Sequence, residues 1–369
     1  MPINRVFINC FESVCCAGDS SEALFEAICA HQSGVKCYTE YIENKPIALG
    51  KIAKPFSIEA LLEFTCKKVL KQSSLENFNN TLLVVGSSVG GMQTTEAIFL
   101  RDHHYKNIDP KLHSIHAIAH ILSQKFSFKD DIAFSTACTS SANALGYGYE
   151  MIAKGVYENV LVVGFDTLSL TTIRGFDALG VQSARPCQPF DVSRDGMNVA
   201  EGIAVLLLQN EPHEKSIELL GVGYSSDAHH MAHPSPDGAG AFQAMQKALK
   251  YAHVKPSEVG YVNAHGTGTT ANDASEATAI EALFGSHAYV SSTKSITGHT
   301  LGAAGALEAI ICALALQKQI LPPNTNLFEP ENKTLGFAYE AHAQPFRYAL
   351  SNSLAFGGNN TALLFGLPQ

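Results

Sequence analysis

The chain has 369 residues, of which 46% are hydrophobic and 16% charged, and its formal net charge at pH 7 is −9. This length exceeds what one hydrophobic core usually supports, so we expect two fused domains or one large duplicated fold. The negative charge argues against general binding to nucleic acid or to an anionic membrane surface, and we find no apolar run long enough for a membrane span.

Segments typical of strands and helices alternate along the first half of the chain. We expect strands at residues 6–10, 81–85, 132–134, 160–163 and 203–208, and helices at 20–29, 58–71, 114–124 and from Cys138 to Gly155. Residues 35–55 show no regular pattern, and a glycine-rich turn at 86–91 follows the second strand.

The second half repeats this alternation. We expect strands at residues 216–224, 260–264, 288–291, 337–340, 348–353 and 361–365, and helices at 241–252, 274–284 and 301–316. The two halves have a similar element order and meet near residues 210–216, which favours an internally duplicated α/β sheet fold over independent modules. We place the domain boundary so that the halves are residues 1–212 and 213–369.

Cys138 stands between a short apolar run and a helical pattern, which predicts a strand, a tight turn and a helix with the thiol at the first helical turn. A helix N-terminus favours a thiolate and so lowers the pKa of a cysteine. The alternative is a buried structural cysteine, the commoner fate of free cysteines. A catalytic role requires a histidine elsewhere in the chain.

Two histidines in the second half of the chain are candidates for this partner of Cys138. His265 follows a predicted strand in the segment NAHGTGT, where Thr267 and Thr269 offer hydroxyl donors. His299 lies in KSITGHTLG, directly before the last long helix. Both are flanked by glycine and threonine, which differ from the aliphatic neighbours of a packed core histidine, so together with Cys138 they favour catalysis.

The cysteines carry no sign of a metal site or of a disulfide framework. The chain has nine of them without a CxxC pair: Cys10, Cys15, Cys16, Cys29, Cys37, Cys66, Cys138, Cys187 and Cys312. An odd number, with neither a secretory signal nor metal-ligand spacing, predicts reduced thiols in a cytoplasm and no bound metal.

Four motifs together resemble the elongating β-ketoacyl-[acyl-carrier-protein] synthases of the thiolase superfamily. They are TACTSSA at 136–142, NAHGTGT at 263–269, STKSITGHTLGAAGALE at 292–308 and FGGNN at 356–360. Further matches at 86–91, 189–191, 194–196 and 227–234 extend the resemblance over nearly the whole chain. It implies a thiolase-like α/β fold, with two duplicated βαβαβαββ halves in five α/β/α/β/α layers.

The same resemblance implies roles for individual residues. Cys138 would be the acylated nucleophile, and His265 and His299 would complete a Cys–His–His set. Lys294 would be the active-site lysine, which we expect to orient His299, five residues further on. Glu308 would be the partner of Lys294, because an unpaired buried carboxylate is costly.

Phe356 would be the gating aromatic residue of the family. The backbone N–H groups of Cys138 and Phe356 are the expected oxyanion donors, with Gly357 and Gly358 freeing the backbone of the second.

Weaker predictions concern polar side chains near this set. Asn263, Asn352 and Asn359 could bind a monovalent cation near Glu308, although plain loop hydrogen bonding is the simpler explanation. We expect Asp273 and Glu276 to lie at a solvated or interfacial helix start.

Several positions depart from the family pattern and suggest altered acyl specificity. Thr94 and Thr95 stand where bulky aliphatic residues often close the acyl pocket. Gln188, the pair Leu354–Ala355 and the segment 197–200 also differ from the residues common in the family. These differences favour a long, unsaturated or aryl-primed chain, as in an aryl polyene pathway.

The resemblance implies an acyl carrier protein as partner, no organic cofactor, and a homodimer or a heterodimer with a paralogue. The sequence argues against two other functions. A thiolase acting on coenzyme A esters needs a second cysteine near the C-terminal glycine loop, and no cysteine follows Cys312. A non-catalytic chain-length partner subunit would lack the nucleophile, whereas Cys138 is present.

Overall fold

The structure is a computed structural model that describes residues 4–53 and 57–368. Its main sheet has the order β12-β10-β9-β14-β15-β8-β1-β7-β6-β4-β5. The bounds of these strands are β1 (Phe7–Cys15), β4 (Thr81–Gly86), β5 (Asp130–Phe134), β6 (Asn159–Asp166), β7 (Gly202–Gln209), β8 (Ile217–Ser226), β9 (Val259–Asn263), β10 (Tyr289–Ser291), β12 (Gly336–Phe337), β14 (Tyr348–Leu354) and β15 (Asn359–Gly366).

Strand order shows that the fold is duplicated. The first half runs β1-β7-β6-β4-β5 and the second runs β8-β15-β14-β9-β10, with the same parallel and antiparallel pairings at corresponding places. The halves join where β1 pairs with β8, at Phe7 with Glu218 and Ile8 with Ile217. The predicted thiolase-like fold is therefore confirmed, while the domain ranges 1–212 and 213–369 stay a prediction.

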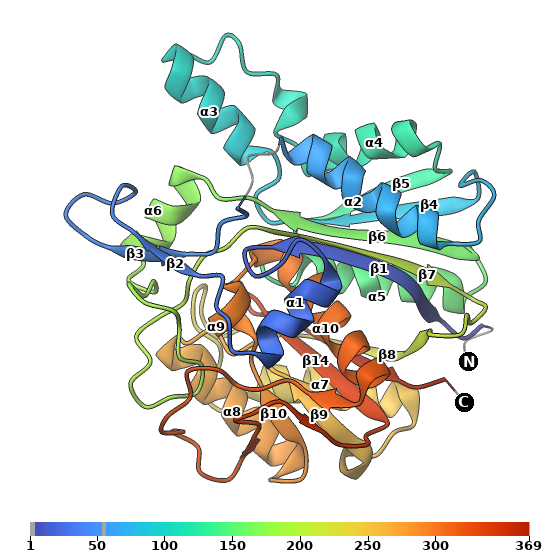
Figure 1. Ribbon diagram of the computed structural model, residues 1–369, viewed down its shortest axis with the longest axis vertical. Helices are drawn as coiled ribbons and strands as arrows, with labels where there is room; N and C mark the ends of the chain where they lie inside the picture. Colours follow the sequence, from blue (N-terminus) through green and yellow to red (C-terminus); the bar gives the residue numbers. More distant parts are fainter. Residues whose placement is uncertain (1–3, 54–56, 369) are drawn as a thin grey trace.

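Helices separate and cover the two half-sheets, so that the layers alternate (Figure 1). Helices α2 and α4 cover one outer face, α7 and α8 the other, and α1, α5 and α10 lie between the half-sheets. The helices are α1 (Ser21–Cys29), α2 (Ile58–Gln72), α3 (Met92–Asp102), α4 (Ile115–Phe126), α5 (Ser140–Ala153), α6 (Leu170–Ala178), α7 (Ala239–Ala252), α8 (Thr270–Phe284), α9 (Lys294–Thr297) and α10 (Ala304–Lys318).

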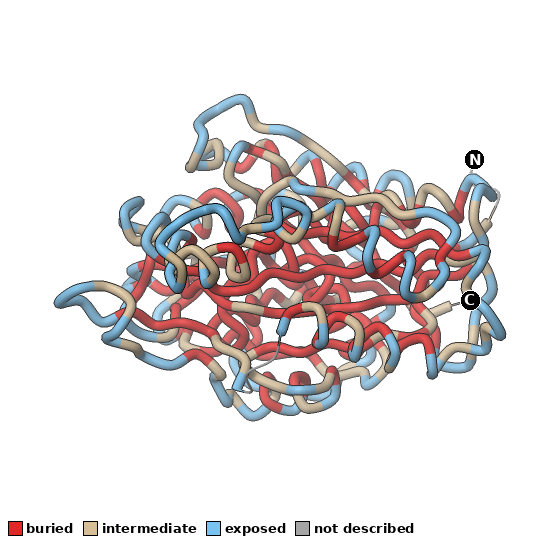
Figure 2. Tube along the Cα trace, turned by 90° about the horizontal axis from the view of Figure 1, so that it is seen from above, coloured by how far each residue is buried: buried red, intermediate tan, exposed pale blue. Residues whose placement is uncertain are grey.

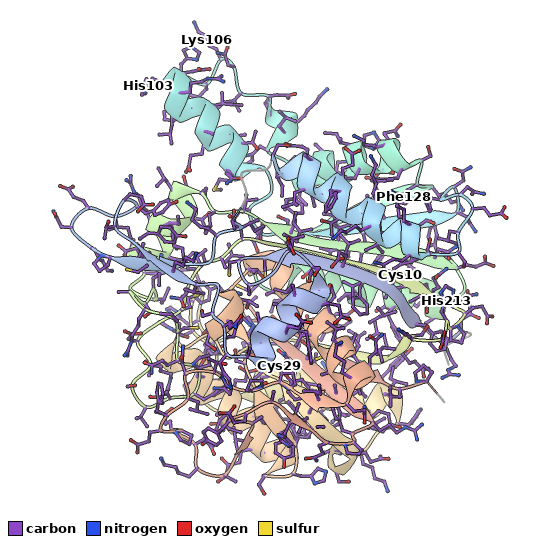
Figure 3. The ribbon with its side chains drawn as sticks, viewed as in Figure 1. Cys10, Cys29, His103, Lys106, Phe128 and His213 are labelled. Carbon is purple, nitrogen blue, oxygen red and sulfur yellow. The ribbon has the colours of Figure 1, made fainter. Side chains whose placement is uncertain are left out.

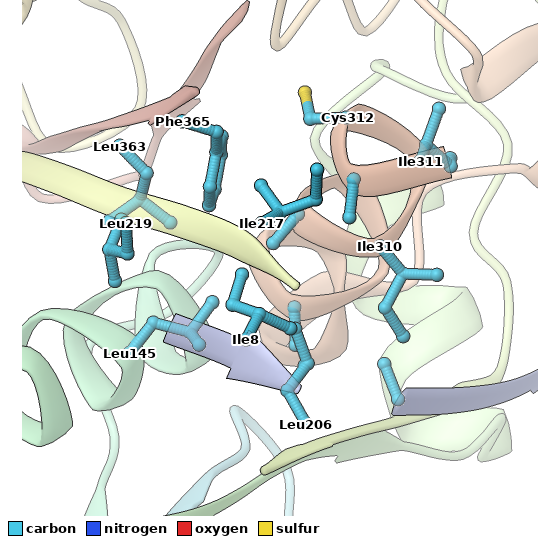
Figure 4. Packing of buried hydrophobic residues seen from close by; sticks show 14 of the residues in the cluster. Ile8, Leu145, Leu206, Ile217, Leu219, Ile310, Ile311, Cys312, Leu363 and Phe365 are labelled. Carbon is cyan, nitrogen blue, oxygen red and sulfur yellow. The ribbon is translucent and has the colours of Figure 1, made fainter. Parts of the chain in front are cut away.

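Buried residues run through the middle of the molecule, and exposed residues lie mainly at its margin, as the red and pale blue parts of the tube in Figure 2 show. Ile8, Leu145, Ile217 and Ile310 come from β1, α5, β8 and α10 and meet in one cluster, each fully buried (Figure 4). Full burial of such a side chain stabilises the fold by roughly 1.5–3 kcal/mol. The cluster therefore fixes α5 and α10 relative to both half-sheets.

Small residues bring α5 and α10 unusually close. A Cβ atom on Gly305 would lie 2.7 Å from the Cβ atom of Ala142, closer than side-chain atoms pack. At the same contact, the backbone N–H of Ala306 donates to Oγ of Ser141 at 2.9 Å. Since Cys138 precedes α5 and His299 precedes α10, this contact brings two predicted catalytic segments together.

One helical segment has the length and hydropathy of a membrane span, contrary to our expectation. Leu301–Lys318 has a mean hydropathy of 1.4, but 89% of it is buried inside the fold. Its small and apolar residues pack against strands and helices on several sides, which is the environment of a core helix.

Several elements differ from the prediction. Residues 35–55 were expected to be irregular, but β2 (Lys36–Tyr38) and β3 (Ile47–Leu49) pair as a small antiparallel sheet. The sequence prediction also missed α3 and α6, because these helices bury few side chains and so lack a strong apolar stripe. Helix α3 forms an arm, and His103 and Lys106 lie at its tip (Figure 3). The strand predicted at 337–340 is reduced to β12.

Candidate active site

Cys138 lies in a strained turn between β5 and α5. The residue before it, Ala137, has a positive φ of 52°, a backbone conformation that is unfavourable for residues other than glycine. Ser140 holds the turn, since its N–H and its Oγ both donate to the carbonyl of Ala137, at 3.0 and 2.6 Å. The turn places Cys138 immediately before the first residues of α5, as predicted.

Three predicted catalytic side chains converge. One ligand atom each of Cys138, His265 and His299 lies within 4.8 Å of the others, and all three residues are buried. The two imidazole rings are nearly perpendicular, with centroids 5.1 Å apart. A sulfur from the first half of the chain and two imidazoles from the second half therefore face a common space.

The expected lowering of the Cys138 pKa is wrong for this state of the protein. Burial raises the pKa of the thiol to about 12, while Lys294 and the backbone N–H groups of Phe356 and Cys138 act in the opposite direction. The effect of the helix N-terminus, which lowers the pKa, is smaller than the effect of removing the sulfur from water, which raises it. The same burial, together with Lys294, holds the pKa of His265 and of His299 well below the usual value. The resting site is thus a neutral thiol beside two neutral imidazoles.

This protonation state predicts a steep pH dependence of thiol labelling. Because the thiolate is the reactive species, alkylation of Cys138 by iodoacetamide should be slow at pH 7 and accelerate through pH 9–10. Peptide mass spectrometry measures the rate at Cys138, and the exposed Cys37 in the same sample is the control. A Cys138 rate that is already at its plateau at pH 7 would show a thiolate at rest and contradict the prediction.

Lys294 contacts His265, and not His299 as the sequence spacing suggested. Its Nζ lies 3.4 Å from Nδ1 of His265 and forms an ion pair with Glu308. An ammonium group can only donate, so Nδ1 accepts and the proton of a neutral His265 resides on Nε2. The lysine thereby sets the tautomer in which His265 presents an N–H donor on its other side.

The ion pair of Lys294 with Glu308 is almost completely buried, with 1% and 4% of the two side chains exposed. Substitution K294M should therefore destabilise the fold by about 3–5 kcal/mol, because Glu308 keeps a buried charge without its partner. Burial already raises the pKa of Glu308, and the loss of Lys294 raises it further. When a carboxyl group has a higher pKa in the folded state than in the unfolded state, the free energy of unfolding falls as the pH rises from the unfolded-state to the folded-state value. The destabilisation caused by K294M should therefore be larger at pH 8 than at pH 5.

Urea denaturation at the two pH values measures this prediction. The double variant K294M/E308L removes both charges and should recover most of the lost stability, because it leaves no unpaired ion. If K294M were as stable as the wild type at pH 8, the pair would contribute nothing and the prediction would fail.

The loop that carries His265 is held by two buried carboxylates, contrary to the prediction of a solvated helix start. Glu276 accepts hydrogen bonds from the backbone N–H of His265 and Gly266, both at 2.7 Å. Asp273 accepts from the N–H of Thr267 at 3.0 Å and of Gly268 at 3.1 Å. Sequence reasoning missed this role. The signal was present, however, because a run of N–H donors before α8 needs acceptors, and the first turns of α8 carry two acids.

His299 is positioned by its backbone. Its N–H donates to the carbonyl of Asn198 at 2.7 Å, and its own carbonyl accepts from the N–H of Ala200 at 2.9 Å. Just beyond it, the buried carboxylate of Asp166 accepts from the N–H of Gly302 at 2.6 Å and from Oγ of Ser87 at 2.6 Å. Asp166 therefore ties the start of α10 to the glycine-rich turn after β4. This contact was not predicted either.

Phe356 lies on the loop between β14 and β15, beside the site. Gly357 and Gly358 have positive φ values of 88° and 79°, and a Cβ atom on Gly358 would lie 2.3 Å from the carbonyl oxygen of Asp227. The ring of Phe356 is tilted against that of Phe176, with centroids 6.0 Å apart. The two glycines thus allow the sharp turn that directs the N–H of Phe356 toward the thiol.

A cavity of about 270 Å³ reaches Cys138, His265 and His299. Its wall includes Phe356 and the two hydroxyl residues Thr267 and Thr269, whose Oγ1 atoms are 2.9 Å apart. Thr94 and Thr95 are not among the described residues that line it, and Oγ1 of Thr95 instead contacts Nδ1 of His113 at 3.0 Å. Within this chain the two threonines therefore stand apart from the cavity.

The four residues proposed for a monovalent cation differ in their hydrogen bonds. Asn263, Glu308 and Asn352 each have a buried side-chain oxygen without a hydrogen-bond partner in the described part of the chain, and so does Ser351, which the sequence did not single out. The amide nitrogen of Asn352 donates to Glu276 at 2.9 Å. Asn359 accepts from Oγ1 of Thr139 at 3.1 Å and from Asn143 at 3.2 Å.

Comparison with known proteins gives a consistent result. The family models "Beta-ketoacyl synthase, N-terminal domain" and "Beta-ketoacyl synthase, C-terminal domain" match residues 57–214 and 217–328. The chain is similar to 3-oxoacyl-[acyl-carrier-protein] synthase 2 of Vibrio harveyi, with 35% identity over 89% of this chain and 85% of that protein.

Many solved structures are similar over almost the whole chain, and two of them are informative. One is the ketosynthase ApeO in complex with its chain length factor ApeC from Xenorhabdus doucetiae, with 31% identity, a TM-score of 0.88, and coverage of 99% of this chain and 98% of that chain. The other is AntDE:AntF, a type II PKS acyl-carrier protein in complex with its ketosynthase bound to the hexaketide, with 26% identity, a TM-score of 0.88 and coverage of 100% of both chains. The chain therefore belongs to the β-ketoacyl synthase family of the thiolase superfamily, and it is an acyltransferase of the ketosynthase type.

Proposed function

We propose that this chain extends an acyl chain by two carbons in the cytoplasm, through decarboxylative condensation with malonyl-[acyl-carrier-protein]. The observation that carries the proposal is the convergence of Cys138, His265 and His299 on one cavity. A cysteine nucleophile splits the condensation into acyl transfer and carbon–carbon bond formation.

In the first step, the Cys138 sulfur attacks the acyl thioester. The bond from the acyl carbon to the carrier sulfur breaks, a bond to Sγ forms, and the thiol proton ends on the released carrier sulfur. The N–H groups of Cys138 and Phe356 would stabilise the negative charge that develops on the thioester oxygen.

In the second step, the malonyl group loses its carboxylate as carbon dioxide, and the electron pair of the broken bond forms an enolate. The enolate carbon attacks the acyl group on Cys138, the bond from the acyl carbon to Sγ breaks, and the leaving thiolate takes a proton from water. Donors on His265 and His299 would stabilise the enolate oxygen. Neutral imidazoles suit this role, and Lys294 fixes the tautomer of His265 that donates from Nε2.

We infer that the carrier is an acyl carrier protein and that the active species is a homodimer. The Vibrio harveyi relative is named a 3-oxoacyl-[acyl-carrier-protein] synthase, and AntDE:AntF is a complex of an acyl-carrier protein with its ketosynthase. The ketosynthase ApeO is in complex with a chain length factor, so a heterodimer is the alternative to the homodimer. Native mass spectrometry of the purified chain tests the subunit count. A monomer that becomes active only with a paralogue would replace the homodimer with a heterodimer.

A condensation assay with carrier-linked acyl donors tests the function itself. The purified chain should release carbon dioxide from malonyl-carrier and form a β-ketoacyl product only when an acyl donor is present. Thiolysis of β-ketoacyl-coenzyme A without decarboxylation would favour a thiolase. An inactive chain whose Cys138 takes no acyl group, while a partner subunit carries it, would favour a chain-length subunit.

We also propose a specialised acyl chain: long, unsaturated or aryl-primed, as in aryl polyene synthesis. Met197, Leu354 and Ala355, which depart from the common family residues, line the cavity. Gln188, another departure, is also buried, but it is not among the described residues that line the cavity. Thr94 and Thr95 do not support this proposal within one chain. A substrate panel that showed preference for ordinary saturated medium chains would contradict it.

The unpartnered oxygens of Asn263, Ser351 and Glu308 fit a monovalent cation, which we propose binds there. Asn263 and Ser351 are neighbours on adjacent strands, and Asn263 donates to the hydroxyl of Tyr261 at 3.1 Å. The charge of Glu308 raises the pKa of the same tyrosine, after the larger effect of burial. The three oxygens thus gather on the α10 side of the sheet, and hard cations prefer oxygen ligands.

Exchange of potassium for choline at constant ionic strength should therefore lower the melting temperature of the wild type. The variant S351A should lose this dependence, because it lacks one ligand, and differential scanning fluorimetry measures both effects. Equal melting temperatures of the wild type in the two salts would exclude a stabilising cation.

A further inference from the structure

The three side chains at the centre of the cavity are also a set of soft metal ligands. One ligand atom each of Cys138, His265 and His299 lies within 4.8 Å of the others, and all three residues are buried. They come from three separate segments of the chain, so the spacing of the cysteines could not indicate a metal site. One thiolate and two imidazoles favour zinc, cobalt or nickel over calcium and magnesium, which prefer oxygen ligands.

A small movement would bring these three ligand atoms around one ion. Zn–S bonds of about 2.3 Å and Zn–N bonds of about 2.0 Å place neighbouring ligand atoms of a tetrahedral site roughly 3.3–3.6 Å apart. The separations in the structure, at most 4.8 Å, therefore have to shrink by about 1.5 Å or less. The cavity of about 270 Å³ reaches all three residues, so it gives the ion and a water ligand access to them.

His299 has a ring nitrogen that the protein does not use. The side chain is 2% exposed, and its Nδ1 atom has no hydrogen-bond partner within residues 4–53 and 57–368. A buried polar atom without a partner is costly. The described residues therefore provide no hydrogen bond at Nδ1 that would hold this imidazole against rotation toward an ion.

We propose that Cys138, His265 and His299 bind one divalent ion of the zinc class, with water as the fourth ligand, and that the bound ion prevents acyl transfer. As the bond from the metal to Sγ forms, the thiol proton passes to water. Coordination lowers the nucleophilicity of the sulfur, and the ion fills the space that a thioester needs. The binding rests on the geometry of the three side chains, whereas the loss of acyl transfer rests on the function proposed above.

Lys294 should limit the affinity of the wild type for such an ion. Its ammonium group donates to Nδ1 of His265 at 3.4 Å, so the proton of the neutral ring resides on Nε2, the nitrogen that faces away from the lysine. A histidine that binds zinc usually donates from its second nitrogen to an oxygen acceptor, which is the reverse arrangement. The positive charge of the lysine also repels a divalent cation. Lys294 therefore protects the active site from soft metal ions.

Isothermal titration calorimetry of the full-length wild type with Zn²⁺, at pH 7.5 under reducing conditions, tests the binding. The wild type should bind one ion per chain saturably, and C138A should bind it at least tenfold more weakly, because it lacks the thiolate ligand. The control C187A removes a buried cysteine that does not line the cavity, so it should bind as the wild type does. Co²⁺ in place of Zn²⁺ should give a thiolate-to-cobalt charge-transfer band that is absent from C138A.

The double variant K294M/E308L tests the role of the lysine without leaving an unpaired buried charge. It should bind Zn²⁺ about 10–100-fold more tightly than the wild type, the range typical of changes to groups that contact a metal ligand. Circular dichroism checks that the variant is folded, and K294Q/E308Q, which keeps both side chains long, replaces it if it is not. An affinity equal to that of the wild type would refute the protective role of Lys294.

Thiol labelling separates the metal site from the condensation reaction. Zn²⁺ should slow the alkylation of Cys138 by iodoacetamide and leave that of the exposed Cys37 unchanged, and this result needs no acyl substrate. Protection of Cys138 in a chain without condensation activity would support the metal site and refute the proposed function. Condensation that persists at saturating Zn²⁺ would refute the inhibition. Absence of saturable binding to the wild type, or equal affinity of the wild type and C138A, would overturn the metal site.

Discussion

Replacement of Cys138 by alanine is expected to abolish malonyl-dependent condensation and to leave the protein folded. The sulfur is the nucleophile of the proposed first step, and among the described residues no other cysteine lines the cavity. The substitution removes one small buried atom, so the destabilisation should be about 1 kcal/mol. Intact-protein mass spectrometry after incubation with acyl-carrier should show an acyl adduct on the wild type and none on C138A.

Cys187 provides a matched control for this variant. Cys187 is buried, and it lies on the segment before Asn198, the residue whose carbonyl accepts from the N–H of His299. Burial also raises the pKa of its thiol, but Cys187 does not line the cavity. The variant C187A should retain the acyl adduct and most of the condensation rate. An adduct that persisted on C138A, or condensation within tenfold of the wild type, would refute the assignment of the nucleophile.

The convergence of Cys138, His265 and His299 could be anticipated because the neighbours of each residue in the sequence differ from those of an ordinary core residue. Glycine and threonine flank the two histidines, and small residues flank Cys138, where aliphatic side chains are usual in a core. Another local signal, a continuous apolar run, allowed the strands β4, β6 and β7 to be predicted. What these signals could not give is the order of strands in the sheet, which depends on pairings between distant segments.

The contact of Lys294 illustrates this limit. His299 lies five residues after Lys294, but α9 ends in a turn at Gly298, and the ammonium group points to His265 in the loop after β9. Sequence distance was therefore a poor guide to spatial distance.

The pKa of Cys138 was mispredicted for a related reason. Position at a helix start is visible in a sequence, whereas the depth of burial that outweighs it is a property of the packed halves.

The carboxylates Asp273 and Glu276 were mispredicted because acids near a helix start are usually solvated. Here the preceding loop folds back over the first turns of α8 and directs four backbone N–H groups at them. The burial of Glu276 raises the pKa of its carboxyl group to about 7, although the N–H donors oppose this shift. The loop thus supplies the hydrogen-bond donors that the two buried carboxylates need. The carboxylates in turn fix the backbone that carries His265.

The variants H265A and H299A are each expected to lower the rate of decarboxylation and condensation by roughly 10²–10³-fold, the loss typical of one removed oxyanion donor. Acyl transfer to Cys138 should be affected less, because its oxyanion donors are backbone N–H groups. Carbon dioxide release from malonyl-carrier measures the first effect, and the acyl adduct on Cys138 measures the second.

The two histidines should also differ in one respect that follows from the geometry. Lys294 donates to Nδ1 of His265, whereas Nδ1 of His299 has no hydrogen-bond partner among the residues that the structure describes. The substitution K294M should therefore impair decarboxylation through His265, and adding it to H265A should cause little further loss of rate. Added to H299A, the same substitution should multiply the loss. If K294M instead acted independently of H265A, the lysine would not set the tautomer of His265, and its role would be confined to pairing Glu308.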